Sequence, residues 1–155
     1  MRLLLMRHAP AQAGADEDPD RPLLPGARLQ LQQPPAPMQA LLADVGLIVT
    51  SPWTRARDTA CALLPFCCAG AGLQNSDALL PDASLVDALA LLENALCEDT
   101  TLLAIGHQPL LGRLVALLCE GPQATPLLPA PGEMAVIELD WPAAGLGTLL
   151  GWQRL

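Results

Sequence analysis

Three short, uninterrupted apolar runs restrict the fold of this chain more than any other feature. They occupy residues 2–6, 46–50 and 101–105, and turn or polar residues bound each of them. Apolar runs of this length are typical of strands that are buried on both faces. The sequence therefore predicts a sheet whose central strands are covered on each side.

Helical patterns separate these runs. The expected helices cover residues 54–64, 84–96 and 109–118. Ser84 is a candidate N-cap of the second helix, and Asp87 stands at its capping-box position in place of the usual Glu or Gln. Pro65 is expected to end the first helix, and Pro109 suits the first turn of the third. Strands that alternate with helices predict an α/β fold, a three-layer sandwich with a mostly parallel central sheet and helices on both faces.

The remaining segments are less regular. Residues 134–139 and 147–153 predict two further strands that form a hairpin. Three prolines interrupt residues 28–43, where we expect a break followed by a short helix from about Met38 to Ala43. This segment is expected to be a connector, and the alternative is a proline-rich docking motif. Residues 65–77 are expected to form only a short loop, which leaves little chain for a lid over a site.

Length and composition indicate a single domain over residues 1–155 with a sizeable core. Hydrophobic residues make up 52% of the chain, but 16 prolines and 12 glycines divide them. No stretch approaches the roughly 20 apolar residues that span a membrane, and the first apolar run is too short for a signal peptide. We therefore expect a cytoplasmic protein without a membrane partner.

The charges exclude one class of partner and favour another. The formal net charge is −8, and all eight basic residues are arginines. Nucleic-acid binding needs clustered basic residues, so no nucleic-acid partner is expected. Arginines gathered in one cleft of an acidic protein would instead attract a small anionic group. The acidic segment 14–20 lacks the spacing of a calcium-binding loop and is expected to be a solvated loop.

The cysteines do not predict a metal site. The five are Cys61, Cys67, Cys68, Cys97 and Cys119. They show no C-x-x-C spacing, and no histidine lies near them in the sequence. We expect free thiols that pack in the core rather than zinc ligands.

Both histidines of the chain directly follow an apolar run. His8 comes after Arg7 at the end of the first run, His107 ends the third, and the second leads to Arg55. Because the carboxyl ends of parallel strands meet at one edge of a sheet, these side chains are expected to share a pocket. A neutral imidazole can attack phosphorus, and guanidinium groups can hold phosphoryl oxygens. The alternative is that both histidines are ordinary hydrogen-bonded groups of the core.

Four motifs resemble those of the histidine phosphatase superfamily, and within it the small SixA-type phosphohistidine phosphatases. In chain order they are Arg7-His8-Ala9, Arg21-Pro22-Leu23 with Gly26, Ser51-Pro52-Trp53-Thr54-Arg55-Ala56 and Gly106-His107-Gln108-Pro109. Ala9 stands where the superfamily has Gly, Leu24 where it has Thr and Gln108 where it has Asn. The order and spacing of the motifs match the family and imply a phosphoglycerate mutase-like fold.

The resemblance also implies a mechanism. His8 would be the nucleophile and would form a covalent phosphohistidine that water then hydrolyses. Arg7, Arg55 and His107 would hold the phosphoryl oxygens, and Arg21 would bind the same group of the substrate. No metal or organic cofactor is implied.

The general acid is less clearly marked. Asp77 and Asp82 are the candidates in the segment before the helix at 84–96. A phosphorylated imidazole leaves more readily than an alkoxide, so a weak acid fits a phosphohistidine substrate. The implied partner is a phosphorylated protein, such as a phosphotransfer domain or phosphocarrier protein. The alternatives are a small phosphate ester as substrate, or a phosphate-binding module without catalytic activity.

Overall fold

Six strands form one mixed sheet in the computed structural model, which describes residues 1–14, 18–96 and 100–155. The strands are β1 (Arg2–Arg7), β2 (Val45–Thr50), β3 (Gly72–Asn75), β4 (Thr101–Gly106), β5 (Glu133–Leu139) and β6 (Gly147–Arg154). Their order across the sheet is β3-β2-β4-β1-β5-β6. Neighbouring strands from β3 to β1 are parallel, and β5 pairs antiparallel with both β1 and β6.

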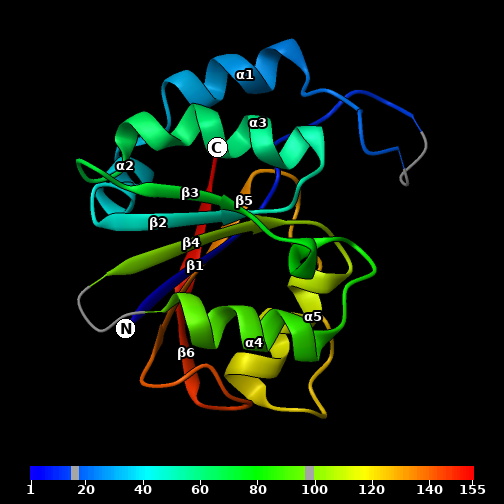
Figure 1. Cartoon of the computed structure of the whole chain (residues 1–155), viewed down its shortest axis with the longest axis vertical. Coiled ribbons are helices and arrows are strands. Elements are labelled where there is room, and N and C mark those ends of the chain that lie inside the picture. Colours follow the sequence, from blue (N-terminus) through cyan, green and yellow to red (C-terminus); the bar gives the residue numbers. More distant parts are fainter. Residues whose placement is uncertain (15–17, 97–99) are drawn as a thin grey trace.

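Helices cover both faces of the sheet (Figure 1). They are α1 (Pro25–Gln32), α2 (Ala36–Leu42), α3 (Thr54–Leu63), α4 (Leu85–Ala95) and α5 (Leu110–Glu120), with short 3-10 helices η1 (Leu64–Phe66) and η2 (Asp77–Leu79). The helices α1, α2 and α3 pack on one face, and α4 and α5 pack on the other. The predicted α/β sandwich is therefore confirmed.

The apolar runs form central strands because both of their faces meet helices. Every residue of β4 is buried. Successive side chains of a strand point to opposite faces, so Leu3 packs with α4 and α5 while Leu4 packs with α1, α2 and α3. The parallel register places Leu3 beside Leu102 and Leu4 beside Leu103. This sheet gives the site a rigid base.

The structure also confirms the expected hairpin and helix starts. The strands β5 and β6 pair antiparallel along their lengths. Ser84 caps α4, where its hydroxyl oxygen accepts a hydrogen bond from the Asp87 amide at 3.0 Å and its O–H donates to the Asp87 carboxylate at 2.7 Å. Pro109 is the N-cap residue of α5. Helix α3 ends at Leu63, and Pro65 lies in the tighter turn η1.

The prediction for residues 28–43 was wrong in its first half. This part of the chain belongs to two helices, α1 and α2, instead of an irregular stretch with one short helix. Pro34 and Pro35 separate the two helices, while Pro25 and Pro37 lie in first turns, where proline needs no N–H partner. The prolines therefore begin helices here, and Pro34-Pro35 is a connector.

The expected short loop at residues 65–77 was also wrong. This segment contains η1 and the edge strand β3, which pairs parallel with β2 from Gly72 to Asn75. The strand was missed because its residues, Gly-Leu-Gln-Asn, form no apolar run, and three of the four are exposed. These residues extend the sheet at its edge.

The thiols are less buried than expected. Cys61 and Cys68 are exposed, whereas Cys67 and Cys119 pack partly against the core, and all four are free thiols. Cys97 lies outside the described residues, as do residues 15–17 of the acidic segment. Among the residues described, no three side chains of the metal-binding types gather closely enough to hold an ion.

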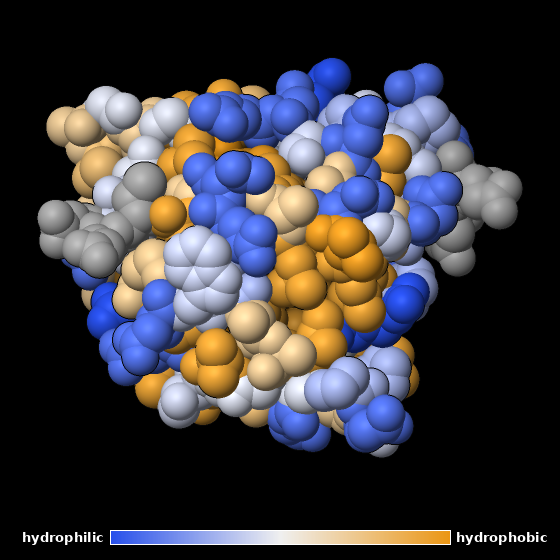
Figure 2. Space-filling model, turned by 60° about the horizontal axis from the view of Figure 1, so that its bottom comes forward, coloured by the Kyte–Doolittle hydropathy of each residue, from blue (hydrophilic) through white to orange (hydrophobic). Residues whose placement is uncertain are grey.

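Large apolar side chains also remain at the surface. Figure 2 shows one side of the molecule, on which hydrophobic atoms form a continuous area between hydrophilic ones. Exposed apolar residues occur on several elements, including Leu29 on α1, Val86 on α4 and Leu150 on β6. Only part of the hydrophobic residues of the chain is therefore buried in the core. None of the described helices has the length and apolar character needed to cross a membrane.

Candidate functional site

The carboxyl ends of three adjacent parallel strands bring distant segments together. His8 follows β1, Ser51 follows β2 and His107 follows β4. The amide of His8 donates to the carbonyl of Gly106 at 3.1 Å, and the amide of Ser51 donates to the carbonyl of Ile105 at 2.9 Å. The sheet register thus continues into the loops and holds the three segments side by side.

A cavity of about 600 Å³ opens at this edge. Its lining residues are Arg7, His8, Arg21, Trp53, Arg55, Pro81, Asp82, His107, Gln108 and Pro109. Six of the seven residues expected from the sequence therefore share one cavity. The exception is Asp77, which is exposed at the start of η2 and does not line it. A larger hollow of about 790 Å³ lies at the opposite edge, beside Arg2 and Thr101, and contains neither histidine.

The hydrogen bonds of His8 define which nitrogen carries its proton. Arg55 Nε donates to His8 Nε2 at 3.2 Å, and a guanidinium group can only donate. Nε2 is therefore the unprotonated nitrogen of the neutral ring. His8 Nδ1 then donates its hydrogen to the carbonyl of Ala9 at 2.8 Å. A lone pair on Nε2 thus lies beside the arginine that lines the cavity, as a nucleophile requires.

The surroundings of His8 keep its ring neutral. Its side chain is almost fully buried, with 4% relative exposure. Burial is the main reason that its pKa falls from 6.5 to about 4, and the positive charges of Arg55, Arg7 and Arg21 lower it further. The hydrogen bond to Ala9 opposes this shift. At neutral pH the imidazole is therefore uncharged and can donate an electron pair.

His107 lies beside His8, with 5.0 Å between the ring centroids. Its Nε2 is 2.9 Å from the hydroxyl of Ser51, and the ring of Trp53 packs against it edge to face with a centroid distance of 4.8 Å. Burial lowers the pKa of His107 well below its usual value, and His8 and the arginines add to the effect. Both histidines are thus neutral at physiological pH.

Arg55 occupies the first turn of α3 and is buried. Besides its contact with His8, it donates from Nη1 to the carbonyl of Asp18 at 2.8 Å. Its guanidinium carbon lies 4.5 Å above the centre of the Trp53 ring, a cation–π contact that fixes the plane of the group. The orientation of Arg55 is therefore set on several sides.

Thr59 links helix α3 to the loop after β1. Its hydroxyl donates to the carbonyl of Arg55 at 2.7 Å and accepts from the amide of Ala9 at 3.0 Å. The side chain is fully buried. One hydroxyl thus sets the distance between the backbones that carry His8 and Arg55.

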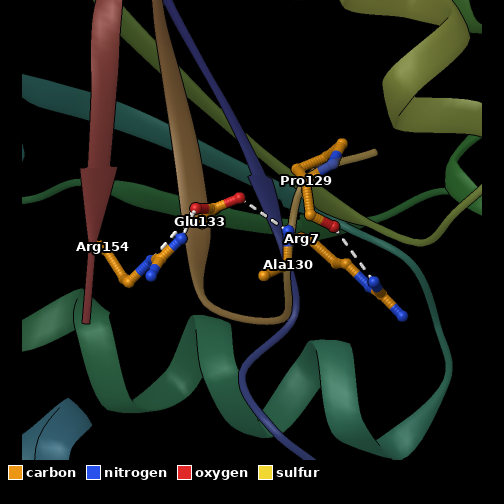
Figure 3. Close-up of polar contacts among 5 residues, drawn as sticks. All are labelled: Arg7, Pro129, Ala130, Glu133 and Arg154. Atoms are coloured by element: carbon orange, nitrogen blue, oxygen red, sulfur yellow. Dashed lines mark hydrogen bonds and ion pairs between the residues drawn. The ribbon is translucent and has the colours of Figure 1, made fainter. Parts of the chain in front are cut away.

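A turn at residues 129–133 supports Arg7 (Figure 3). Arg7 Nη1 donates to the carbonyl of Pro129 at 3.0 Å. Glu133 accepts from the amide of Ala130 at 2.6 Å and also forms an ion pair with Arg154 on β6, which holds the pKa of Glu133 below its usual value. Figure 3 shows these contacts as a chain from β6 through the turn to the end of β1.

Gly132 completes this turn with a conformation that favours glycine. Its φ is +84°, and its amide donates to the carbonyls of both Arg7 and His8. A β-carbon would also lie 3.1 Å from the side chain of Leu155. The backbone of the Arg-His pair is therefore held from the side of β5.

Two of the three departures from the family motifs, Gln108 and Leu24, differ in their contacts. Gln108 donates from Nε2 to the carbonyl of Leu127 at 3.1 Å and accepts from the amide of Gly112 at 3.0 Å. The longer amide thus ties the first turn of α5 to the segment before β5. Leu24 is the N-cap residue of α1, makes no side-chain capping bond and is exposed. It does not line the cavity.

Arg21 also lines the cavity, and its Nη1 donates to the carbonyl of Gly14 at 3.2 Å. Together, Arg7, Arg21 and Arg55 place three guanidinium groups around two neutral imidazoles. Such a set can neutralise the charge of a tetrahedral oxyanion and stabilise the charge that develops during phosphoryl transfer. Apart from Asp82, every ionisable group that lines the cavity is an arginine or a histidine.

Sequence reasoning did not identify Ser51 and Thr59 as parts of the site. In the sequence, Ser51 is marked only as the first residue of a motif, and Thr59 lies inside a helical pattern with no distinguishing neighbour. Their hydroxyls contact His107 and Ala9 only after the helix and the strands pack together. The motif position of Ser51 was the only available signal.

The low pKa of His8 predicts a loss of stability in mild acid. Below pH 6.5 the unfolded chain binds a proton at His8 that the folded chain does not bind until about pH 4. Stability from the neutral ring is thus complete above pH 6.5 and is lost as the pH falls towards 4, by about 3 kcal/mol. Chemical denaturation at several pH values would measure this loss. His8→Asn, which stays neutral, should show a smaller decrease, and equal decreases in the two proteins would contradict the prediction.

Comparisons with known proteins agree with this geometry. No model of a protein family matches the sequence, and no curated protein does. A structure of the protein histidine phosphatase SixA complexed with tungstate is 26% identical, with a TM-score of 0.81 over 99% of this chain and 97% of that chain. A candidate SixA from Nakamurella multipartitia is 24% identical, with a TM-score of 0.72 over 99% and 95%. A mycobacterial glucosyl-3-phosphoglycerate phosphatase complexed with VO3 is 16% identical, with a TM-score of 0.73 over 99% of both chains.

Proposed function

We propose that the chain is a phosphohistidine phosphatase of the histidine phosphatase superfamily with His8 as its nucleophile, because its structure is similar to that of a SixA protein histidine phosphatase. The observation that carries this proposal is the unprotonated Nε2 of His8, which receives the Arg55 N–H at the wall of an arginine-lined cavity. The proposed substrate is a phosphohistidine on a cytoplasmic partner protein, such as a phosphotransfer domain or phosphocarrier.

The proposed reaction has two displacements at phosphorus. In the first, the lone pair of His8 Nε2 is released from its hydrogen bond with Arg55 and forms a bond to phosphorus while the bond to the substrate imidazole breaks. The substrate imidazole carries a proton on its other nitrogen and so leaves as a neutral ring. In the second, water attacks the phosphorus of phospho-His8, and the bond to Nε2 breaks. Inorganic phosphate and neutral His8 are released. The arginines and His107 stabilise the charge on the phosphoryl oxygens in both steps.

The residues that line the cavity favour a substrate whose leaving group is a flat ring. Trp53, Pro81 and Pro109 line it together with the charged groups. These apolar surfaces suit a flat imidazole better than a polyhydroxylated sugar, which needs many hydrogen-bond partners. The structural similarity to a SixA protein bound to tungstate, an oxyanion shaped like phosphate, supports the same assignment.

Trapping of the intermediate would test the proposal. The protein would be mixed briefly with a ³²P-phosphohistidine protein in the presence of a metal chelator and then denatured in alkali, in which phosphohistidine survives. We expect label on His8 and release of inorganic phosphate without added metal. If no label appeared on His8 and no labelled phosphate were released into solution, the proposal would be contradicted. That result would favour a phosphate-binding module without catalytic activity.

A second candidate function, hydrolysis of a small phosphate ester, is favoured by one observation. Asp82 lines the cavity and offers a carboxyl group that can protonate an alkoxide. This candidate has the same nucleophile and the same arginines, and differs in its need for an acid. The phosphatase from mycobacteria that shares the fold acts, by its name, on glucosyl-3-phosphoglycerate.

Asp82→Asn should distinguish the two substrates. We expect less than about a threefold change in turnover of a phosphohistidine protein, because the imidazole leaves readily, but a loss on the order of 100-fold for an alkyl phosphate that needs an acid. Asp77→Asn is the matched control, because Asp77 is exposed and lies outside the cavity. Efficient turnover of an alkyl phosphate that depends on Asp82, with none of a phosphoprotein, would make the ester the substrate.

A further inference from the structure

A buried serine contacts the second histidine of the site. Ser51 follows β2 and has no exposed surface. Its hydroxyl oxygen lies 2.9 Å from His107 Nε2, and its amide is held by the carbonyl of Ile105 at 2.9 Å. The side chain therefore reaches His107 from a fixed backbone position.

A second contact bears on the direction of this hydrogen bond. The amide of Trp53 donates to the Ser51 hydroxyl oxygen at 3.4 Å. The Trp53 amide occupies one of the two lone pairs of that oxygen, and the hydroxyl keeps one hydrogen that it can donate to His107 Nε2. Burial keeps the His107 ring neutral, and a neutral ring that accepts at Nε2 carries its hydrogen on Nδ1. A hydroxyl that donates to Nε2 would thus favour one of the two tautomers of His107.

The selected tautomer leaves a donor for an incoming group. His107 Nδ1 is buried, and among the described residues it has no hydrogen-bond partner. Its ring forms the wall of the cavity next to His8. A buried N–H without a partner is unfavourable, and a phosphoryl oxygen bound beside His8 would accept its hydrogen bond.

We infer that Ser51 is a positioning residue, whose hydroxyl holds His107 in the Nδ1–H tautomer so that this N–H is available to the phosphoryl oxygens. This inference rests on the proposed function for its consequence in catalysis. The tautomer itself does not depend on any activity, so the two can be tested separately.

Nuclear magnetic resonance of the imidazole nitrogens would test the tautomer directly. The chain has only two histidines, so ¹⁵N-histidine labelling yields four ring nitrogens to assign. We expect His107 to be protonated on Nδ1 in the unliganded protein. In Ser51→Ala the Nε2–H tautomer should appear at His107, while the His8 signals stay unchanged. A wild-type His107 protonated on Nε2, or a tautomer unaffected by Ser51→Ala, would overturn the inference.

Kinetics of the same variant would test the catalytic consequence. We expect Ser51→Ala to lower kcat on the order of 10- to 100-fold, by analogy with the loss of a group that orients a metal-binding histidine, with little change in KM. Thr50→Val is the matched control, because Thr50 is an equally buried neighbour whose hydroxyl bonds only to the carbonyl of Ser51 among the described residues. It should retain wild-type kcat and the wild-type tautomer.

The outcomes separate the two proposals. An inactive wild-type protein with the Nδ1–H tautomer at His107 would contradict the phosphatase function and retain the structural role of Ser51. An active wild-type protein whose kcat and His107 tautomer are insensitive to Ser51→Ala would retain the phosphatase and overturn the role of Ser51. Equal losses of kcat in Ser51→Ala and Thr50→Val would show a general packing effect and also overturn it.

Discussion

Substitution of His8 by alanine is expected to remove turnover of a phosphohistidine protein almost completely. The loss should be on the order of 10⁴- to 10⁶-fold in kcat, as when a nucleophile is removed from a hydrolase that forms a covalent intermediate. The reason is that the alanine side chain offers no lone pair in the position of His8 Nε2, beside Arg55. The measurement is the release of inorganic phosphate, with circular dichroism as a check that the variant is folded.

The second histidine provides a comparison for this result. His107→Asn should lower kcat by about 100- to 1000-fold, as expected for one donor to a developing oxyanion. It should still acquire label on His8, because it retains the proposed nucleophile, whereas His8→Ala should acquire none. Substantial turnover by His8→Ala, or label on another residue of the wild type, would contradict the assignment of His8 as nucleophile.

Replacement of Arg55 by lysine is expected to have an effect as large as that of His107→Asn. Lysine keeps the charge but loses the planar fork that reaches His8 Nε2 and the carbonyl of Asp18 at the same time. The stacking on Trp53 would also change. We expect kcat/KM to fall by about 100- to 1000-fold, and inhibition by tungstate to weaken, since both depend on the same geometry around the oxyanion.

Arg57→Lys is the control for this experiment. Arg57 lies two residues further along α3 and is exposed, so it points away from the buried position of Arg55. It does not line the cavity of His8 and His107. Its substitution should leave kcat/KM and tungstate inhibition unchanged. A similar loss in both variants would show that the general positive charge of α3, rather than the placement of Arg55, determines activity.

The central strands could be predicted because strands that are buried on both faces have a distinctive apolar composition. A strand covered on both faces needs apolar residues in succession, and β1, β2 and β4 have them. The edge strand β3 has no such requirement, and it forms because the backbone of β2 offers hydrogen-bond partners along its open side. Helix α1 was not predicted, because a segment with several prolines was expected to be irregular. Pro25 instead lies in the first turn of this helix.

Part of the candidate site could be predicted from the sequence for a similar reason. His8, Arg55 and His107 follow apolar runs within five residues, so the convergence of parallel strands was enough to expect them in one place. The groups that support these three side chains had no comparable sequence signal. Ser51, Thr59 and the turn at 129–133 act through hydroxyls and carbonyls that are common everywhere in proteins. Only packing gives these ordinary groups a partner.

By itself, the sequence determined which segments are buried, because runs of apolar side chains gain free energy when they leave water, whatever their partners. It also determined the kinds of chemical group that the strand ends carry. The tertiary structure alone decided which nitrogen of His8 bears a proton and which carboxylate, Asp82 rather than Asp77, lines the cavity. Those properties depend on hydrogen bonds a few ångströms long between residues far apart in the chain, and such distances exist only once the layers have packed.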